Sequence, residues 1–348
     1  MYNVSEEKIS DRNVSVEFLR VLFTFVICLH HFRMYSDSMP YGGGYIAVDF
    51  FFIISGYYTA EHFRNFDDNG RRIRGGLAYL LSRYRRLIGT YIISFFLEVL
   101  CRIVFFKEKF LGTIRGYVCE LFMLEIGGNS SKDRINPPDW YCGILLIATV
   151  ILVIIIVAGI NKIPSPFYLG TACFIYAVLF YKYGHVNIYP QYVGIAYMSI
   201  FRGLAGLMTG TWLNRITGKT YHGEKRNLSL ISIVLLIWIL YMTLWDNAYS
   251  YTDYLVIAAF IFVFYTCILG YIQINNEKLS KTILLMGRIS YSIYLNHYLV
   301  ALIFSKTRVF CRCDWKLISA VYLFCVILVS AIVYYIVNKI GKYICERT

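Results

Sequence analysis

Long apolar runs alternate with short polar segments along almost the whole chain. Ten of these runs are each near the roughly 20 residues that an α-helix needs to cross the hydrocarbon of a bilayer. They predict an all-α, polytopic integral membrane protein with about ten transmembrane helices. The predicted spans are residues 17–35, 46–63, 86–106, 140–160, 167–184, 194–213, 228–245, 253–273, 283–305 and 316–338.

Two shorter features interrupt this pattern. The apolar segment Gly116–Ile126 is too short to span and carries Glu120 and Glu125. We expect an interfacial or re-entrant piece there, and the alternative is an eleventh helix. The stretch "YGGGY" (Tyr41–Tyr45) joins the first two predicted helices. Its glycines permit tight turns and close backbone approach, so we expect either a flexible turn or a stretch that lines a substrate.

The composition favours a membrane protein over a soluble one. Of the 348 residues, 58% are hydrophobic and 16% are charged, whereas a soluble domain typically has about 25% charged residues. The ten cysteines lack the spacing of a metal site or a disulfide framework, and Cys311 and Cys313 are the only local pair. We therefore expect no metal and no permanently bound cofactor.

The distribution of positive charge predicts the orientation, because lysine and arginine collect in cytoplasmic loops. The predicted loops 185–193 and 246–252 hold no lysine or arginine, whereas 64–86 and 214–227 are basic; segment 107–139 is also basic and fits the alternation poorly. We expect both termini in the cytoplasm, residues 1–16 as a short cytoplasmic tail, and 1–348 as a single membrane-embedded domain in the cell membrane. The net charge of +13 then reflects loops beside anionic lipid rather than a nucleic-acid partner. The basic residues of the two basic loops are Arg64, Arg71, Arg72, Arg74, Arg83, Arg85, Arg86, Arg215, Lys219, Lys225 and Arg226.

The first predicted helix carries ionisable residues that a bilayer tolerates poorly. Arg20 and His31 are eleven residues apart, so they share one face about 16 Å apart along the axis, while His30 points about 80° away from His31. Ionisable groups inside a bilayer usually face a polar cavity. A cation can hold an anionic or polarised group there, and an imidazole can act as a base. The alternative is that Arg20 reaches the lipid headgroups and the histidines mark the outer interface.

Several motifs, taken together, resemble the membrane acyltransferase-3 family. They are the Arg20–His31 spacing, "IAVDFFFIISGYY" with Asp49 and Ser55, "SRYRRLIGTYI" with Arg83 and Arg86, "FRGLAGLMTG" with Arg202, and "SYSIYLNH" ending at His297. Their order spans nearly the whole chain. The departures are Val21 where the family usually has glycine, "LIGTY" where a proline usually closes the arginine stretch, and no glutamate in "WYCGILLIATV".

The resemblance implies a membrane enzyme that transfers an acyl group, most often acetyl, from cytoplasmic acyl-CoA to an extracytoplasmic carbohydrate hydroxyl. It implies His31 as the base, with Arg20 on the same face. The expected partners are membrane lipids, acetyl-CoA and a cell-surface polysaccharide or lipid-linked glycan precursor. Two alternatives stay open, a transporter or exporter without chemistry of its own and a structural partner of a polysaccharide assembly complex.

The remaining candidate residues each have a plainer alternative. Asp49 is expected to orient His31 or bind sugar hydroxyls, or else to cap a helix. For the arginines after the second helix the alternative is anchoring by the positive-inside rule, and for the tyrosines it is packing or an interface belt. The arginines expected to hold the coenzyme A phosphates are Arg83, Arg85 and Arg86, and the residues expected to contact substrate are Ser55, Arg202, Tyr291, Tyr294 and His297.

Overall fold

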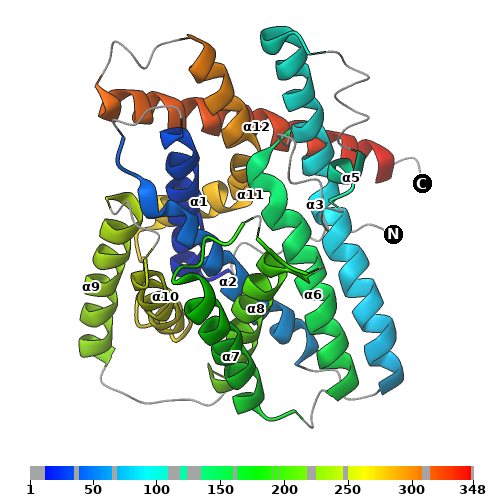
Figure 1. Cartoon of the computed structure of the whole chain (residues 1–348), viewed down its shortest axis with the longest axis vertical. Helices are drawn as coiled ribbons and strands as arrows, with labels where there is room; N and C mark the ends of the chain where they lie inside the picture. The colour runs from blue at the N-terminus through cyan, green and yellow to red at the C-terminus, as the bar shows by residue number, and fades with distance from the viewer. Residues whose placement is uncertain are drawn as a thin grey trace.

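The protein is an all-helical bundle with one very short β-hairpin (Figure 1). The computed structural model describes residues 12–34, 39–64, 69–108, 118–123, 135–159, 163–189, 191–194, 196–217, 225–245, 250–307 and 314–345. Within these ranges the long helices are α1 (Val14–Arg33), α2 (Ala47–Phe63), α3 (Asn69–Phe106), α6 (Trp140–Gly159), α7 (Ser165–Tyr183), α8 (Met198–Thr217), α9 (Lys225–Leu244), α10 (Thr252–Ile268), α11 (Glu277–Thr307) and α12 (Trp315–Cys345). The short elements are the 3-10 helix η2 (Gly42–Ile46), α5 (Val118–Leu121), the 3-10 helix η3 (Pro137–Asp139), and the antiparallel strands β1 (Tyr192–Val193) and β2 (Ala196–Tyr197). The predicted all-α class is confirmed.

Each predicted span coincides with one long helix, although some boundaries differ. The span 253–273 ends early, at Ile268, because Gly270 adopts the left-handed conformation that commonly terminates a helix. The span 194–213 begins late because the β1–β2 hairpin occupies the residues before Met198. Among the described residues, five helical stretches, in α1, α3, α6, α9 and α12, are long and apolar enough to cross a membrane. They support a membrane protein, and the total of ten crossings stays a prediction.

The basic segment after α2 is helix rather than loop, which corrects the predicted boundary of the third span. Helix α3 begins at Asn69 and continues without a break through Arg83 to Phe106. Leucine, alanine and arginine are strong helix formers and outweigh the polarity of this stretch. Its glycine Gly76 also lets the helix lie against Val153 and Val157 of α6. The arginines here are therefore held on a rigid element.

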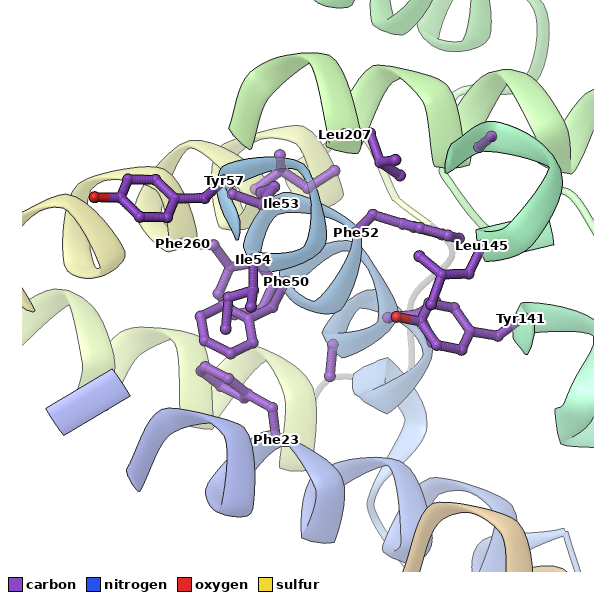
Figure 2. Packing of buried hydrophobic residues seen from close by; sticks show 14 of the residues in the cluster. Phe23, Phe50, Phe52, Ile53, Ile54, Tyr57, Tyr141, Leu145, Leu207 and Phe260 are labelled. Atoms are coloured by element: carbon purple, nitrogen blue, oxygen red, sulfur yellow. The ribbon is translucent and has the colours of Figure 1, made fainter. Parts of the chain in front are cut away.

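Helix α2 lies in the middle of the bundle and packs closely on α8. A methyl group added to Gly56 would collide with the backbone of Leu207, and one added to Gly210 would collide with the backbone of Ile53. Small residues of this kind let two helices approach closely in a membrane. The opposite side of α2 carries Phe50, which meets Phe23 of α1 edge to face at a centroid distance of 4.6 Å (Figure 2).

The glycine-rich turn between α1 and α2 is buried and tightly packed. A methyl group on Gly43 would strike the backbone of Met242, and one on Gly44 would strike the His30 side chain. The turn is also tied to α9, because the Tyr41 amide donates to the Leu244 carbonyl at 2.6 Å. It is therefore a packed turn rather than a flexible one, and a role in lining substrate stays a prediction.

The segment around Glu120 folds onto the helices. Its described part contains only the four-residue helix α5, too short to cross a membrane. The buried Glu120 carboxylate accepts hydrogen bonds from the backbone amides of Ile135 (3.3 Å) and Asn136 (2.9 Å). No eleventh spanning helix forms among the described residues here. Glu125, like Cys311 and Cys313, lies outside them.

Candidate active site

Arg20 is held by an acidic partner on its own helix. Its Nη1 donates to both carboxylate oxygens of Glu17, at 2.8 and 3.1 Å, and its Nη2 reaches the Ser290 hydroxyl at 3.4 Å. Glu17 is buried against Gly287 of α11, where any side chain would collide with it. Glu17 did not figure in the sequence prediction, and its i,i+3 spacing from Arg20 is the signal that could have found it.

His31 and His297 lie side by side, although they are far apart in the sequence. Their ring centroids are 5.0 Å apart, one on α1 and the other on α11. The Nδ1 of His31 lies 3.0 Å from the Ile27 carbonyl. A carbonyl can only accept, so Nδ1 carries the proton and Nε2 of the neutral ring has a lone pair. The same reasoning applies to His297, whose Nδ1 donates to the Tyr294 carbonyl at 2.5 Å.

The second nitrogen of His297 is buried. Among the described residues its Nε2 has no hydrogen-bond partner. His30 is turned to the glycine-rich turn, where its Nδ1 donates to the Tyr41 carbonyl at 3.0 Å. The His31 ring therefore lies between two imidazoles, with centroid distances of 5.0 Å to His297 and 5.2 Å to His30.

Two tyrosines connect this pair to the rest of the interior. The Tyr294 ring lies 5.8 Å from that of His297 and 5.6 Å from that of Tyr141 of α6. The Tyr294 hydroxyl donates to the Pro138 carbonyl. Tyr291 is partly buried elsewhere on the same helix, with its hydroxyl 3.4 Å from the Leu87 carbonyl, a contact that suits packing. Tyr141, the second residue of the "WYCGILLIATV" stretch, did not figure in the sequence prediction.

Arg83 is turned into the bundle, whereas Arg85 and Arg86 are exposed. The Arg83 Nη2 donates to the Ser55 hydroxyl at 2.9 Å, and its Nη1 donates to the Tyr79 hydroxyl at 3.0 Å. Ser55 lies at the middle of α2. The structure thus separates the three predicted arginines, and it places Arg83 inside a helix rather than in a loop before it.

The Asp49 carboxylate is hydrogen-bonded to Arg202 and not to His31. This corrects the prediction that Asp49 orients His31. The Arg202 guanidinium donates to the Asp49 carboxylate through Nη2 (2.5 Å) and Nε (3.1 Å), and both side chains are completely buried. The Tyr176 hydroxyl is 3.5 Å from the same carboxylate. The helix-cap alternative is also wrong, because Ile46 precedes the helix and makes no side-chain cap. A role in binding sugar hydroxyls stays a prediction.

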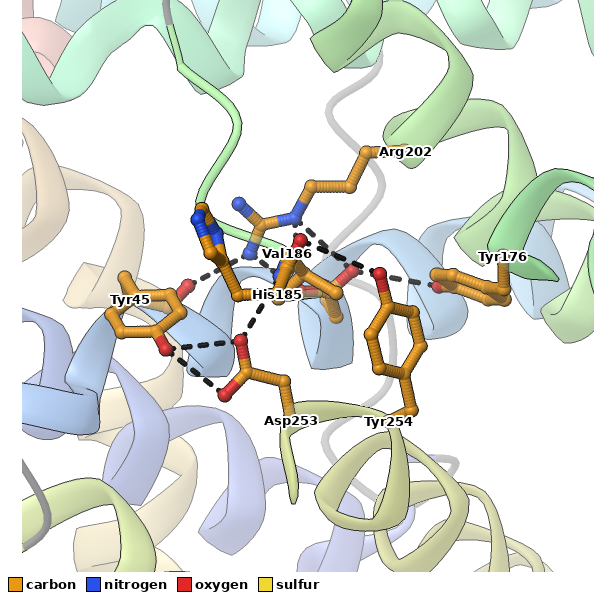
Figure 3. A network of polar contacts seen from close by, with 8 residues as sticks. Tyr45, Tyr176, His185, Val186, Arg202, Asp253 and Tyr254 are labelled. Atoms are coloured by element: carbon orange, nitrogen blue, oxygen red, sulfur yellow. Dashed lines mark hydrogen bonds and ion pairs between the residues drawn. The ribbon is translucent and has the colours of Figure 1, made fainter. Parts of the chain in front are cut away.

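The Asp49–Arg202 pair belongs to a larger buried network (Figure 3). Arg202 also donates to the Tyr45 carbonyl at 2.9 Å, and the Tyr45 hydroxyl donates to Asp253 at 2.9 Å. Asp253 accepts a further bond from the Val186 amide at 3.0 Å. Burial and the nearby Arg202 charge lower the pKa of His185, which lies in the connection after α7, so it is neutral near pH 7. The network joins the start of α2 to α8, α10 and this connection.

A second group of polar residues holds the η3 turn beside α11. The Tyr91 hydroxyl donates to Asp139 at 2.6 Å, and the Asn136 amide donates to the Leu295 carbonyl at 2.9 Å. Glu98 of α3 is completely buried, and neither of its carboxylate oxygens has a hydrogen-bond partner among the described residues. The described residues contain no group of three histidine, cysteine or acidic side chains that could hold a metal.

Side chains from five helices form a row of contacts through the interior, here called the polar track. It passes from Arg83 and Ser55 to Tyr141, whose hydroxyl is within electrostatic reach of both. It continues through Tyr294 to His297 and His31. The track has a cation, Arg83, at one end and two imidazoles at the other, and a neutral imidazole can take a proton from a hydroxyl.

Comparison with known proteins gives one result for the whole chain. A family model described as an acyltransferase domain, the acyltransferase-3 type, matches residues 13–339. No curated protein and no solved structure matches the chain. The match begins just before α1 and ends within α12, so it includes every residue of the polar track. The chain belongs to the acyltransferase-3 family.

Proposed function

We propose that this protein is a membrane O-acetyltransferase of the cell membrane. The donor is cytoplasmic acetyl-CoA, and the acceptor is a hydroxyl of a cell-surface polysaccharide or of a lipid-linked glycan precursor. Family membership supports the acyl transfer. The hydrogen bond between His31 Nδ1 and the Ile27 carbonyl carries the proposal further, because it leaves the lone pair on Nε2 to act as a base.

The proposed reaction needs one base and no redox step. The acceptor oxygen attacks the thioester carbonyl carbon, and its proton passes to His31 Nε2. The carbon–sulfur bond then breaks, the coenzyme A thiolate leaves, and it takes up the proton that the imidazole held. General-base catalysis of this kind contributes roughly 10²–10⁴ in rate.

The arginines have different parts in this proposal. Arg83 holds a phosphate of coenzyme A, because its guanidinium is turned inward and its Nε is buried without a hydrogen-bond partner among the described residues. Arg85 and Arg86, exposed on the same helix, attract the anionic donor to the cytoplasmic side. Arg20, partly neutralised by Glu17, polarises the donor near the start of α1.

The polar network around Arg202 belongs to the acceptor side of the proposed topology. With both termini in the cytoplasm, the α7–α8 connection and the start of α2 face outward. Arg202 Nη1 is buried and has no hydrogen-bond partner among the described residues, so it can donate to a sugar oxygen. Asp49 and Ser55 are the other predicted substrate contacts on α2.

The test is acetyl transfer by the protein itself. Membranes that contain the protein and its native surface glycan are given acetyl-CoA labelled in the acetyl group. An acetyltransferase releases coenzyme A and moves label into carbohydrate in equal amounts. A transporter or exporter moves label across the membrane without releasing coenzyme A, and that result would overturn the proposal.

A further inference from the structure

We propose that His31 and His297 act as one proton-holding pair, and that Tyr322 of α12 sets their spacing. This inference rests on the proposed function, because it concerns the proton that His31 takes from the acceptor. In it, His297 is not a substrate contact but a positioning residue that acts through His31.

The first support is the arrangement of the two rings. Their centroids are 5.0 Å apart, and each Nδ1 donates to a carbonyl of its own helix, Ile27 for His31 and Tyr294 for His297. Both Nε2 atoms therefore have lone pairs. Leaving a buried acceptor unsatisfied is costly. His297 Nε2 is such an acceptor, and a protonated His31 is a donor that could satisfy it.

The second support is the set of groups that face the pair. Helix α1 contributes His30, which has the charge of Arg33 near it, and Cys28. Helix α11 contributes Tyr294, and α12 contributes Tyr322. Among the described residues no carboxylate hydrogen-bonds to either ring. Two imidazolium charges this close repel each other strongly in a poorly solvated interior, so the pair holds one extra proton rather than two. His30 is also close to His31, but its Nδ1 is engaged by the glycine-rich turn. We assign the stabilisation of the proton to His297, because its buried Nε2 has no hydrogen-bond partner among the described residues.

Tyr322 ties together the two helices that carry the pair. Its hydroxyl is 3.2 Å from the Cys28 carbonyl on α1 and 3.0 Å from the carbonyl of His297 itself, and the two carbonyls share its one proton. Its ring stacks on Phe32, the residue after His31, at 3.9 Å with an interplanar angle of 4°. One side chain thus fixes the turn before His31, the residue after it and the backbone of His297.

The proposed cycle takes up one proton and releases one proton. The acceptor hydroxyl loses its proton to His31 Nε2 as the new carbon–oxygen bond forms, and His297 Nε2 accepts a hydrogen bond from the resulting imidazolium. When the carbon–sulfur bond breaks, the proton moves to the coenzyme A sulfur and both imidazoles are neutral again. The pair holds the proton between these two events and consumes none.

The experiment compares four variants in membranes at equal protein levels, with labelled acetyl-CoA and the native glycan. His297→Leu removes the acceptor nitrogen, whereas His297→Gln keeps a side-chain acceptor. Tyr322→Phe keeps the stack on Phe32 and loses only the hydroxyl. Tyr335→Phe, at a site on the same helix that is 66% exposed, is the matched control. Rates are measured across the pH range at saturating and limiting acetyl-CoA.

We expect His297→Leu to lower kcat about 10–100-fold with little change in KM. Without its partner the imidazolium is less stable, so the acidic limb of the rate profile should move to lower pH. His297→Gln should move that limb less, and Tyr322→Phe should lower kcat about 3–10-fold, within the range of a lost positioning contact. Tyr335→Phe should match wild type.

A wild-type kcat and pH profile in His297→Leu would overturn the pairing, and a wild-type Tyr322→Phe would overturn the role given to α12. If His297→Leu does not reach the membrane, His297→Ala, which also lacks the acceptor nitrogen, carries the same test, and a wild-type pH profile in that variant would overturn the pair. Failure of the proposed function looks different: His31→Ala would then transfer acetyl as well as wild type. Loss of acetyl transfer in His31→Ala together with wild-type transfer in His297→Leu would overturn this inference and leave the proposed function intact.

Discussion

The Arg202 guanidinium and the Asp49 carboxylate form a completely buried ion pair, with Nη2 and Oδ2 2.5 Å apart. The pair joins α8 to the start of α2, the two helices that also meet through their glycines. Arg202 continues from it to the Tyr45 carbonyl. The pair therefore fixes the α2–α8 contact at the end where α2 begins.

Breaking this pair from one side should destabilise the protein strongly. Arg202→Gln leaves the Asp49 carboxylate buried without its cation, an effect of about 3–5 kcal/mol for pairs of this kind. Thermal unfolding in detergent should show a clear loss of stability. The double variant Arg202→Gln with Asp49→Asn should recover part of it, because no charge is then left alone. A double variant less stable than Arg202→Gln would contradict this explanation.

The glycine contact between α2 and α8 gives a second stability test. Gly56→Ala places a methyl group against the Leu207 backbone, which cannot move aside as a side chain would. We expect destabilisation of about 1–3 kcal/mol or more. Gly170→Ala is the matched control, because nothing lies within 4 Å of its added methyl group. Equal thermal midpoints for the two variants would show that the α2–α8 approach is looser than described.

Arg83 should strongly affect the binding of acetyl-CoA, whereas exposed arginines on the same helix should affect it much less. Arg83→Gln removes a guanidinium that faces Ser55 in the interior, and a lost charge-assisted hydrogen bond is worth about 1.5–3 kcal/mol. We expect KM for acetyl-CoA to rise about tenfold or more with KM for the acceptor unchanged. Arg74→Gln, exposed earlier on α3, should stay within about twofold of wild type. An unchanged KM for acetyl-CoA in Arg83→Gln would favour a purely structural role.

The proposed topology places the two ends of α2 on opposite sides of the membrane. In a cysteine-free background, Val193→Cys in the hairpin should react with an impermeant thiol reagent in intact cells. Arg64→Cys at the end of α2 should react only after permeabilisation. Labelling of Arg64→Cys in intact cells would reverse the orientation and remove Arg83 from the cytoplasmic side.

The apolar pattern was sufficient to locate every long helix among the described residues. Each helix buries one stripe or is apolar all round, and that pattern is local in the sequence. The start of α3 was missed for a different reason. Its many arginines resemble a basic loop, but the helix propensity of this stretch and the packing of Gly76 against α6 make it helical.

The site was predictable only in part, because its decisive contacts are not local. Helical spacing identified the face shared by Arg20 and His31, and the family resemblance drew attention to His297. Neither could show that His297 lies against His31, or that Asp49 faces Arg202 instead. Nothing in the sequence distinguished Tyr322, since a tyrosine in an apolar helix is more often a packing or interface residue. Such pairings follow from how the helices assemble.

The most direct test of the whole account is acetyl transfer by His31→Ala and His30→Ala at matched membrane levels. The two histidines are adjacent, but only His31 is proposed to act as the base, while His30 is bonded to the glycine-rich turn. We predict that His31→Ala loses at least about 100-fold in the transfer of label from acetyl-CoA to carbohydrate. His30→Ala should keep transfer within a few-fold of wild type. Near-normal transfer by His31→Ala, or loss of transfer in His30→Ala alone, would contradict it.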